Sequence, residues 1–133
     1  MFSDFDKYLC SSFSIDYWSD EGISQAANIV SEFTENDWEE LDSSLSNQNE
    51  SWQIRCAESL GDVENNYSLD ILLTLLNSES SEVQIAVLDS VSALLSSGMS
   101  AIDCQNDIRR VIEQIDSESS VVNMMIKSLE TKL

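Results

Sequence analysis

The sequence predicts an all-α protein, built as a short α-solenoid of antiparallel helix pairs with an N-terminal helical cap. Three observations support this fold class. Similar segments recur along the chain, their apolar residues fall on one face of a helix, and the alternation of a half-buried strand is nowhere sustained. The length of 133 residues suits one domain, residues 1–133.

Residues 1–50 are expected to form the cap, because no part of this segment repeats visibly. A first helix is predicted around Phe2 to Phe13, and a second over SDEGISQAANIVSEF, which ends at Phe33. A third begins at Thr34, where TENDWEEL is close to a capping box with Asp37. Such a cap would cover the apolar face that an end repeat otherwise exposes.

Residues 51–133 are expected to hold the repeats. WQIRCAESL (Trp52–Leu60) aligns with VQIAVLDSV (Val83–Val91), and the second copy aligns with VVNMMIKSL (Val121–Leu129), so that Val83 pairs with Val121. The tetrapeptide SESS occurs at Ser78–Ser81 and again at Ser117–Ser120. Pairing these two copies would match Val83 with Val122 instead, which leaves the register ambiguous by one position. Each SESS is predicted to be a turn in which a serine caps the next helix.

The first repeat is predicted to be helix, turn, helix. Trp52 and Leu60 begin and end one apolar helical face, and Gly61 is expected to end that helix as a left-handed C′ glycine. DVENNYS then forms the turn, and Leu69–Leu76 the second helix, whose apolar pattern returns at Ile108–Ile115. The third repeat is expected to be a lone capping helix, for about seven helices in all.

Within this pattern, ESWQIRCAESLGD resembles the first helix of a HEAT repeat, with Arg55 near that pattern's usual arginine, and Leu69–Leu76 resembles the second. The resemblance covers about Thr34 to Leu133 and implies a HEAT-like α-solenoid. The chain departs from the pattern in having no proline, and in having Ala86 where the second unit would carry the arginine.

Residues for catalysis are missing from the sequence. The chain has no histidine and only three glycines, so neither a histidine relay nor a phosphate-binding loop is present. Asp62, Glu64 and Asn66 have the spacing of a calcium loop, but Tyr67 and Leu73 occupy the places of its glycine and final glutamate. We therefore expect no enzyme activity, no cofactor and no metal site.

The three cysteines are widely spaced, so no disulfide is expected. Cys56 falls on an apolar helical face and is interpreted as a core residue, and Cys10 is interpreted similarly. Cys104 is expected at the surface.

Charge is the most unusual property of the chain. Twenty-five acids face six bases, for a net charge of −19, and residues 1–50 have Lys7 as their one base. Such a surface repels nucleic acid and anionic lipid and attracts a cationic partner. The alternative interpretation is that the acidity only keeps the protein soluble. The start of the chain has acids where a secretion signal would have a basic region, and no apolar run is long enough for a membrane span, so a cytoplasmic location is expected.

Contacts with a basic partner are expected from two groups of residues. Tyr17 lies among acids and is interpreted either as an anchor or as part of the cap, whereas Trp18, Trp38 and Trp52 are interpreted as core residues. The first group lies in the strongly acidic N-terminal part: Asp16, Tyr17, Asp20, Glu21, Glu35, Asp37, Glu39, Glu40 and Asp42. The second lies at the turns between repeats: Glu79, Glu82, Asp116 and Glu118.

Small acidic HEAT-like chains of this kind resemble bacterial immunity proteins of contact-dependent growth inhibition and other polymorphic toxin systems. The resemblance implies a heteromeric complex in which the chain binds a cognate basic toxin domain, expected to be a nuclease such as an RNase, and occludes its active site. Two alternatives remain: an acidic HEAT-repeat scaffold or adaptor, and a nucleic-acid mimic that sequesters DNA-binding proteins.

Overall fold

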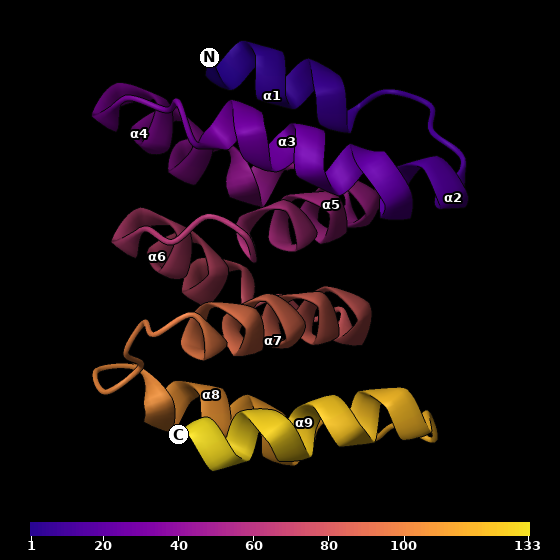
Figure 1. Ribbon diagram of the computed structural model, residues 1–133, viewed down its shortest axis with the longest axis vertical. Helices are drawn as coiled ribbons and strands as arrows, with labels where there is room; N and C mark the ends of the chain where they lie inside the picture. The colour runs from indigo at the N-terminus through magenta and orange to yellow at the C-terminus, as the bar shows by residue number, and fades with distance from the viewer.

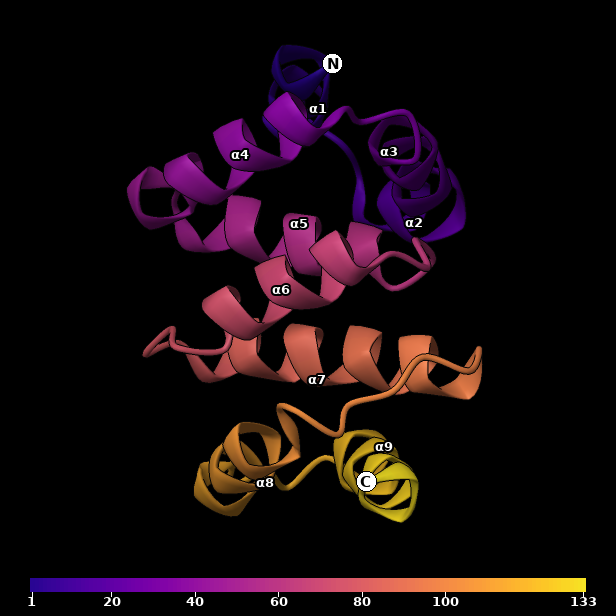
Figure 2. The same cartoon turned by 90° about the vertical axis from the view of Figure 1, so that its left-hand side faces the viewer.

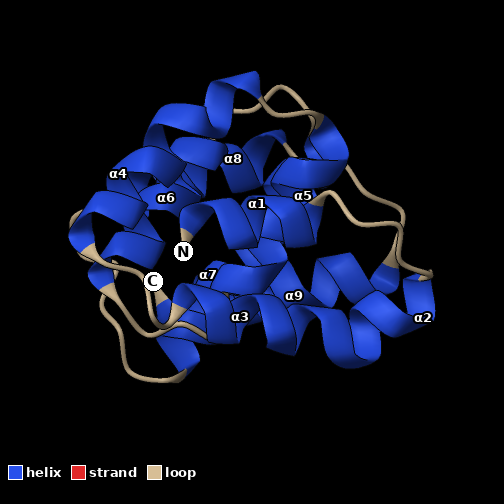
Figure 3. Ribbon diagram, turned by 90° about the horizontal axis from the view of Figure 1, so that it is seen from above, coloured by secondary structure: helices blue, strands red, loops and turns tan.

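The computed structural model describes all 133 residues and contains helices and no strand (Figures 1 and 3), which confirms the all-α class. In chain order the elements are α1 (Phe2–Leu9), α2 (Ile15–Tyr17), the π-helical segment η1 (Trp18–Gly22), α3 (Ile23–Val30), α4 (Glu35–Ser44), the 3-10 segment η2 (Leu45–Asn47), α5 (Glu50–Leu60), α6 (Asn66–Leu75), α7 (Ser81–Ser96), α8 (Gln105–Gln114) and α9 (Ser120–Lys132). The first helix is shorter than predicted and ends before Phe13.

The helices form two rows in a repeat-like stack. We call α3, α5, α7 and α9 the first row; each of them contacts the next. We call α4, α6 and α8 the second row, which lies beside the first (Figure 2). The pair α3 and α4 therefore continues both rows into residues 1–50, where the sequence shows no repeat, and α1 covers the end of the stack by packing on α3, α4 and α5.

Equivalent caps begin the three helices that the sequence alignment brings together. The side chains of Asn49, Ser80 and Ser119 accept hydrogen bonds from backbone N–H groups three residues later, at 2.9, 3.3 and 3.3 Å. The two SESS turns also share an inner bond: the hydroxyls of Ser78 and Ser117 accept from the N–H groups of Ser80 and Ser119, both at 3.1 Å. These matching bonds pair the two SESS copies, so the alignment of Val83 with Val121 is displaced by one position.

The core runs through both rows as one cluster. Its largest fully buried members include Phe5, Leu41, Leu60, Leu72, Leu88 and Leu94. Trp18, Trp38 and Trp52 are buried, as the sequence predicts. Burial of apolar surface at about 25 cal/mol per Å² is the main term that holds such a stack together.

Arg55 ties the N-terminal part to the repeats. Its Nη1 donates to the backbone carbonyls of Leu9 and Ser11 at 2.8 and 2.7 Å, and its guanidinium lies over the rings of Phe13 and Trp18. These groups belong to the end of α1, the α1–α2 loop and η1. One arginine of α5 therefore fixes the connection on which the cap depends, and it pairs with no carboxylate.

Three expectations about individual residues are wrong. Gly61 has φ −63°, an ordinary helical value, and the one glycine with positive φ is Gly98, at 112°. Cys104 is buried and Cys10 is exposed, the reverse of what the sequence suggested; Cys56 is buried as expected, and all three thiols are free. A polar sequence around Cys104 says little about burial, because packing of the chain decides it.

Candidate functional site

Carboxylates in this protein are almost entirely without cationic partners. The ion pairs are those of Arg110 with Asp107 and of the N-terminal amine with Asp4 and Asp37. Lys132 instead donates to the hydroxyls of Ser92 and Ser128. The surface therefore carries an uncompensated negative charge that a basic partner can neutralise.

Part of this charge is concentrated in a groove between α4 and α6, in the second row. The groove encloses about 230 Å³ and is lined by Glu35, Trp38, Glu39, Asp42, Tyr67, Asp70, Ile71 and Thr74. Two caps fix its walls: Thr34 and Asp37 form a capping box at the start of α4, and Asn65 accepts from the N–H of Tyr67 at the start of α6, at 2.8 Å. We call this site the acidic groove.

An aromatic pair joins the two walls of the acidic groove. The rings of Trp38 and Tyr67 stack with their centroids 5.5 Å apart and their planes 15° from parallel. The Tyr67 hydroxyl donates to Oε1 of Glu35 at 3.2 Å. This hydrogen bond, the charge of Glu35, and the neighbouring Glu39 and Asp70 raise the pKa of Tyr67. The phenol therefore remains a neutral donor at physiological pH.

The groove has the chemistry of a receptor for an ammonium or guanidinium group. Its lining contains four carboxylates and no basic side chain. Carboxylates form charge-assisted hydrogen bonds with such groups, and an aromatic face adds cation–π attraction. Tyr67 is exposed enough to offer part of its ring to a partner.

Three of the predicted contact residues meet in this groove, because Glu35, Glu39 and Asp42 follow one another at helical spacing on a single face of α4. Glu40 faces away: it accepts from Asn36 Nδ2 at 2.9 Å and lines a shallow surface beside Phe2. The sequence placed Tyr67 in a turn and did not single out Asp70. Their spacing of three residues is a signal for one helical face, but only the fold brings that face opposite α4.

Asp37 has a structural position rather than an exposed one. Only 8% of it is accessible, and its carboxylate accepts from the N–H of Thr34 at 2.9 Å and from the N–H of Phe2 at 3.2 Å. The Thr34 bond, followed by the Phe2 bond and the N-terminal amine, holds the pKa of Asp37 below its usual value. We therefore remove Asp37 from the expected contact residues, since its oxygens already join α1 to α4.

The other acids of the first group lie elsewhere. Asp16, Tyr17, Asp20 and Glu21 are exposed on α2 and η1, across the molecule from α4 (Figure 3). The Tyr17 ring packs on Phe13, with centroids 4.9 Å apart, and its hydroxyl lies 3.3 Å from that of Tyr8. Partial burial and this hydrogen bond raise the pKa of Tyr8 to about 12. Tyr17 thus contributes to the cap while keeping an exposed edge.

The turn acids Glu79, Glu82, Asp116 and Glu118 are all exposed. They lie where α7 and α9 begin, on the edge of the stack that also carries α2 (Figure 1). Apart from Asp37 and Glu40, the expected contact residues therefore divide into two regions: the acidic groove, and an edge formed by helix N-termini.

No group of three or more His, Cys, Asp or Glu side chains is arranged to hold a metal ion. None of the helices combines the length and the hydropathy that a bilayer crossing requires. Comparisons of the chain with known protein families, with characterised sequences and with solved structures find no match. The functional argument therefore depends on the fold and the surface.

Proposed function

We propose that the protein is an immunity protein, which binds a cognate basic toxin domain and neutralises it by covering its active site. The observation that carries this proposal is the acidic groove, with four carboxylates around a stacked aromatic pair and no cation among them. A nuclease must hold phosphate in a basic cleft, so a nuclease domain, such as an RNase, has the complementary charge.

Electrostatic attraction would both accelerate association with the toxin and direct the toxin to the acidic groove. A net charge of −19 accelerates the encounter with a basic domain, and salt screens that effect over about 10 Å at 0.1 M. Within the complex, lysine or arginine side chains of the toxin would enter the acidic groove and pair with Glu35, Glu39, Asp42 and Asp70. These are the side chains that the toxin would otherwise use for its substrate, so occlusion and charge pairing act together.

The proposal implies a basic toxin domain encoded beside the gene of this protein, and the experiment uses that domain with the purified protein. Nuclease activity and association rate are measured at low and high salt with the wild-type protein, with E35Q/E39Q/D42N/D70N, and with E79Q/E82Q/D116N/E118Q as a control of equal charge. We expect stoichiometric inhibition by the wild type, and loss of about 2–5 kcal/mol of binding for each groove carboxylate that is desolvated in the complex. The turn variant should lose chiefly association rate.

Other results would favour other functions. Binding without inhibition would favour a scaffold or adaptor, and competition with DNA for a DNA-binding protein would favour a nucleic-acid mimic. If E35Q/E39Q/D42N/D70N still inhibits the toxin but E79Q/E82Q/D116N/E118Q does not, the interface lies on the edge that carries Glu79 and Asp116.

A further inference from the structure

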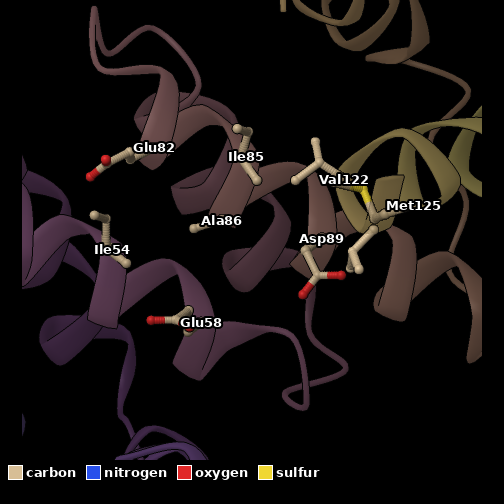
Figure 4. A pocket seen from close by; sticks show the side chains of 9 residues that line it. Ile54, Glu58, Glu82, Ile85, Ala86, Asp89, Val122 and Met125 are labelled. Atoms are coloured by element: carbon tan, nitrogen blue, oxygen red, sulfur yellow. The ribbon is translucent and has the colours of Figure 1, made fainter. Parts of the chain in front are cut away.

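A second groove crosses the first row, on helices that the acidic groove does not use. It encloses about 370 Å³ and is lined by Ile54, Glu58, Glu82, Ile85, Ala86, Asp89, Val121, Val122 and Met125, from α5, α7 and α9 (Figure 4). The small side chain of Ala86 leaves room between α5 and α7, and apolar side chains form most of the lining. We call this site the first-row groove.

The lining of this groove contains acids but no basic side chain. Glu58 and Asp89 face the space between α5 and α7 (Figure 4), and no Lys or Arg lines it. The pKa of Glu58 is raised, chiefly by burial and further by the charge of Asp89. The hydrogen bond that Glu58 accepts from Trp18 and the charge of Arg55 act in the opposite direction but do not cancel this rise. Arg55 directs its Nη1 to backbone carbonyls instead. An ammonium or guanidinium of a ligand would supply a countercharge within the groove itself.

Apolar surface continues from the groove along α9. Val121 is 75% exposed and Met124 is 70% exposed, and they are neighbours three residues apart on the helix. Methionine adapts to differently shaped partners, which makes such positions frequent in binding surfaces. No other part of the chain covers these two side chains.

We propose that the first-row groove binds a basic amphipathic helix of another protein, with one apolar side chain seated over Ala86 and flanking Lys or Arg side chains paired with Glu58, Glu82 and Asp89. Helices commonly dock in this way, with an apolar face in a groove and charges at the rim. A second copy of this chain fits poorly, because two chains of net charge −19 repel each other. The inference is independent of the toxin assignment.

Trp18 provides a reporter for this groove. Its indole Nε1–H donates to Oε1 of Glu58 at 3.1 Å, so its NMR resonance reports on that carboxylate. The other two indoles serve as internal references: Trp38 belongs to the acidic groove, and Trp52 donates to Asp6 at 3.0 Å. A ligand in the first-row groove should therefore shift the Trp18 signal and leave that of Trp52 in place.

The probe is a synthetic amphipathic helix with a leucine face and lysines elsewhere. Two matched peptides replace the leucines by alanine or the lysines by glutamate. We expect the first peptide to shift the Trp18 resonance in a saturable manner and the other two to bind at least tenfold more weakly. An equal Trp18 shift with the alanine peptide would overturn the proposal, because charge alone would then explain binding. So would a response confined to Trp38.

Variants of α7 test the location. Ala86→Arg fills the groove with a cation, whereas Ala93→Arg adds the same charge at an exposed position two turns further along α7, outside the groove. We expect at least tenfold weaker peptide binding for A86R and less than a twofold change for A93R. E58Q/D89N, which preserves side-chain size, should also weaken binding; its thermal melt shows whether it is folded.

Equal peptide affinity of A86R and wild type contradicts the proposal. Concentration-dependent self-association that A86R abolishes would assign the groove to a second copy and also overturn it. In the toxin experiment, the comparison of wild type with E35Q/E39Q/D42N/D70N is unaffected by either result, since those four carboxylates line the acidic groove.

Discussion

Gly61 and Ser90 mark a close approach between α5 and α7. A Cβ added to Gly61 would lie 3.0 Å from the Ser90 hydroxyl oxygen and 3.3 Å from the Ser90 Cα. That hydroxyl is itself fixed, because it donates to the carbonyl of Ala57 at 2.5 Å. Glycine is favoured here by the narrow space between two helices of the first row, whereas its φ of −63° is open to any residue.

Substitutions at Gly61 and Gly98 should separate crowding from backbone strain. We expect G61A to destabilise the protein by about 1 kcal/mol and G61L by about 3 kcal/mol, because larger groups force α7 away. G98A should cost about 1–2 kcal/mol through its φ of 112°, and G98L little more, since nothing lies within 4 Å of that position. Urea unfolding of the four variants measures these differences. Equal costs for G61A and G61L would contradict the crowding.

Local features of the fold were accessible from the sequence. The cap at Thr34 and a serine cap in each SESS turn follow from residue type and position, and the structure confirms them, with Ser80 and Ser119 as the serines. Gly61 shows where this reasoning ends. A glycine after a helix is compatible with two explanations, a left-handed turn or the close approach of another helix. Only the packing of α7 against Gly61 shows that the second applies.

The acidic groove could be predicted in part. Spacing along one helix puts Glu35, Glu39 and Asp42 on the same face, but the opposite wall comes from Asp70 and Tyr67, which belong to a different helix. Their position depends on how α4 and α6 pack. The first-row groove was missed apart from Glu82, because three helices from separate repeats form it.

Asp37 should stabilise the protein in a pH-dependent manner. Its pKa is lowered in the folded state, so its contribution is present above the unfolded-state pKa and is lost as pH falls through the folded-state value. D37A should therefore melt below wild type at pH 7, and the two melting curves should converge in acid. D42A, on the exposed side of the same helix, is the control. A constant difference at every pH would show that the charge of Asp37 is unimportant.

Thiol labelling tests the burial of the cysteines. In the native protein an aromatic disulfide reagent should titrate Cys10 alone, and in denaturant all three thiols, because Cys56 and Cys104 are buried. Partial desolvation and the Asp6 carboxylate raise the pKa of Cys10, so its reaction should be slower than that of a free thiol at pH 7.5. C10S should abolish native labelling. A second thiol reacting at the same rate would place Cys104 at the surface, as the sequence alone suggested.

Glu58 should oppose folding at neutral pH. Its pKa is raised in the folded state, chiefly by burial. The protonated carboxyl therefore adds to the free energy of unfolding in full below the unfolded-state pKa, and this contribution is lost as pH rises through the folded-state pKa. The groups that face it are Asp89 on α7, Arg55 on its own helix and the Trp18 indole. Glutamine at this position keeps an acceptor for the indole and removes the charge.

We therefore expect E58Q to melt above wild type at pH 7, and the difference to vanish below about pH 4, where glutamate is protonated even when unfolded. Removing any acid from a chain of net charge −19 relieves some repulsion, so the comparison is made with E130Q, at an exposed position on α9. The stabilisation of E58Q should exceed that of E130Q at pH 7. If the two variants melt together, the cost of ionised Glu58 is general repulsion, and the first-row groove has no particular need of a cation.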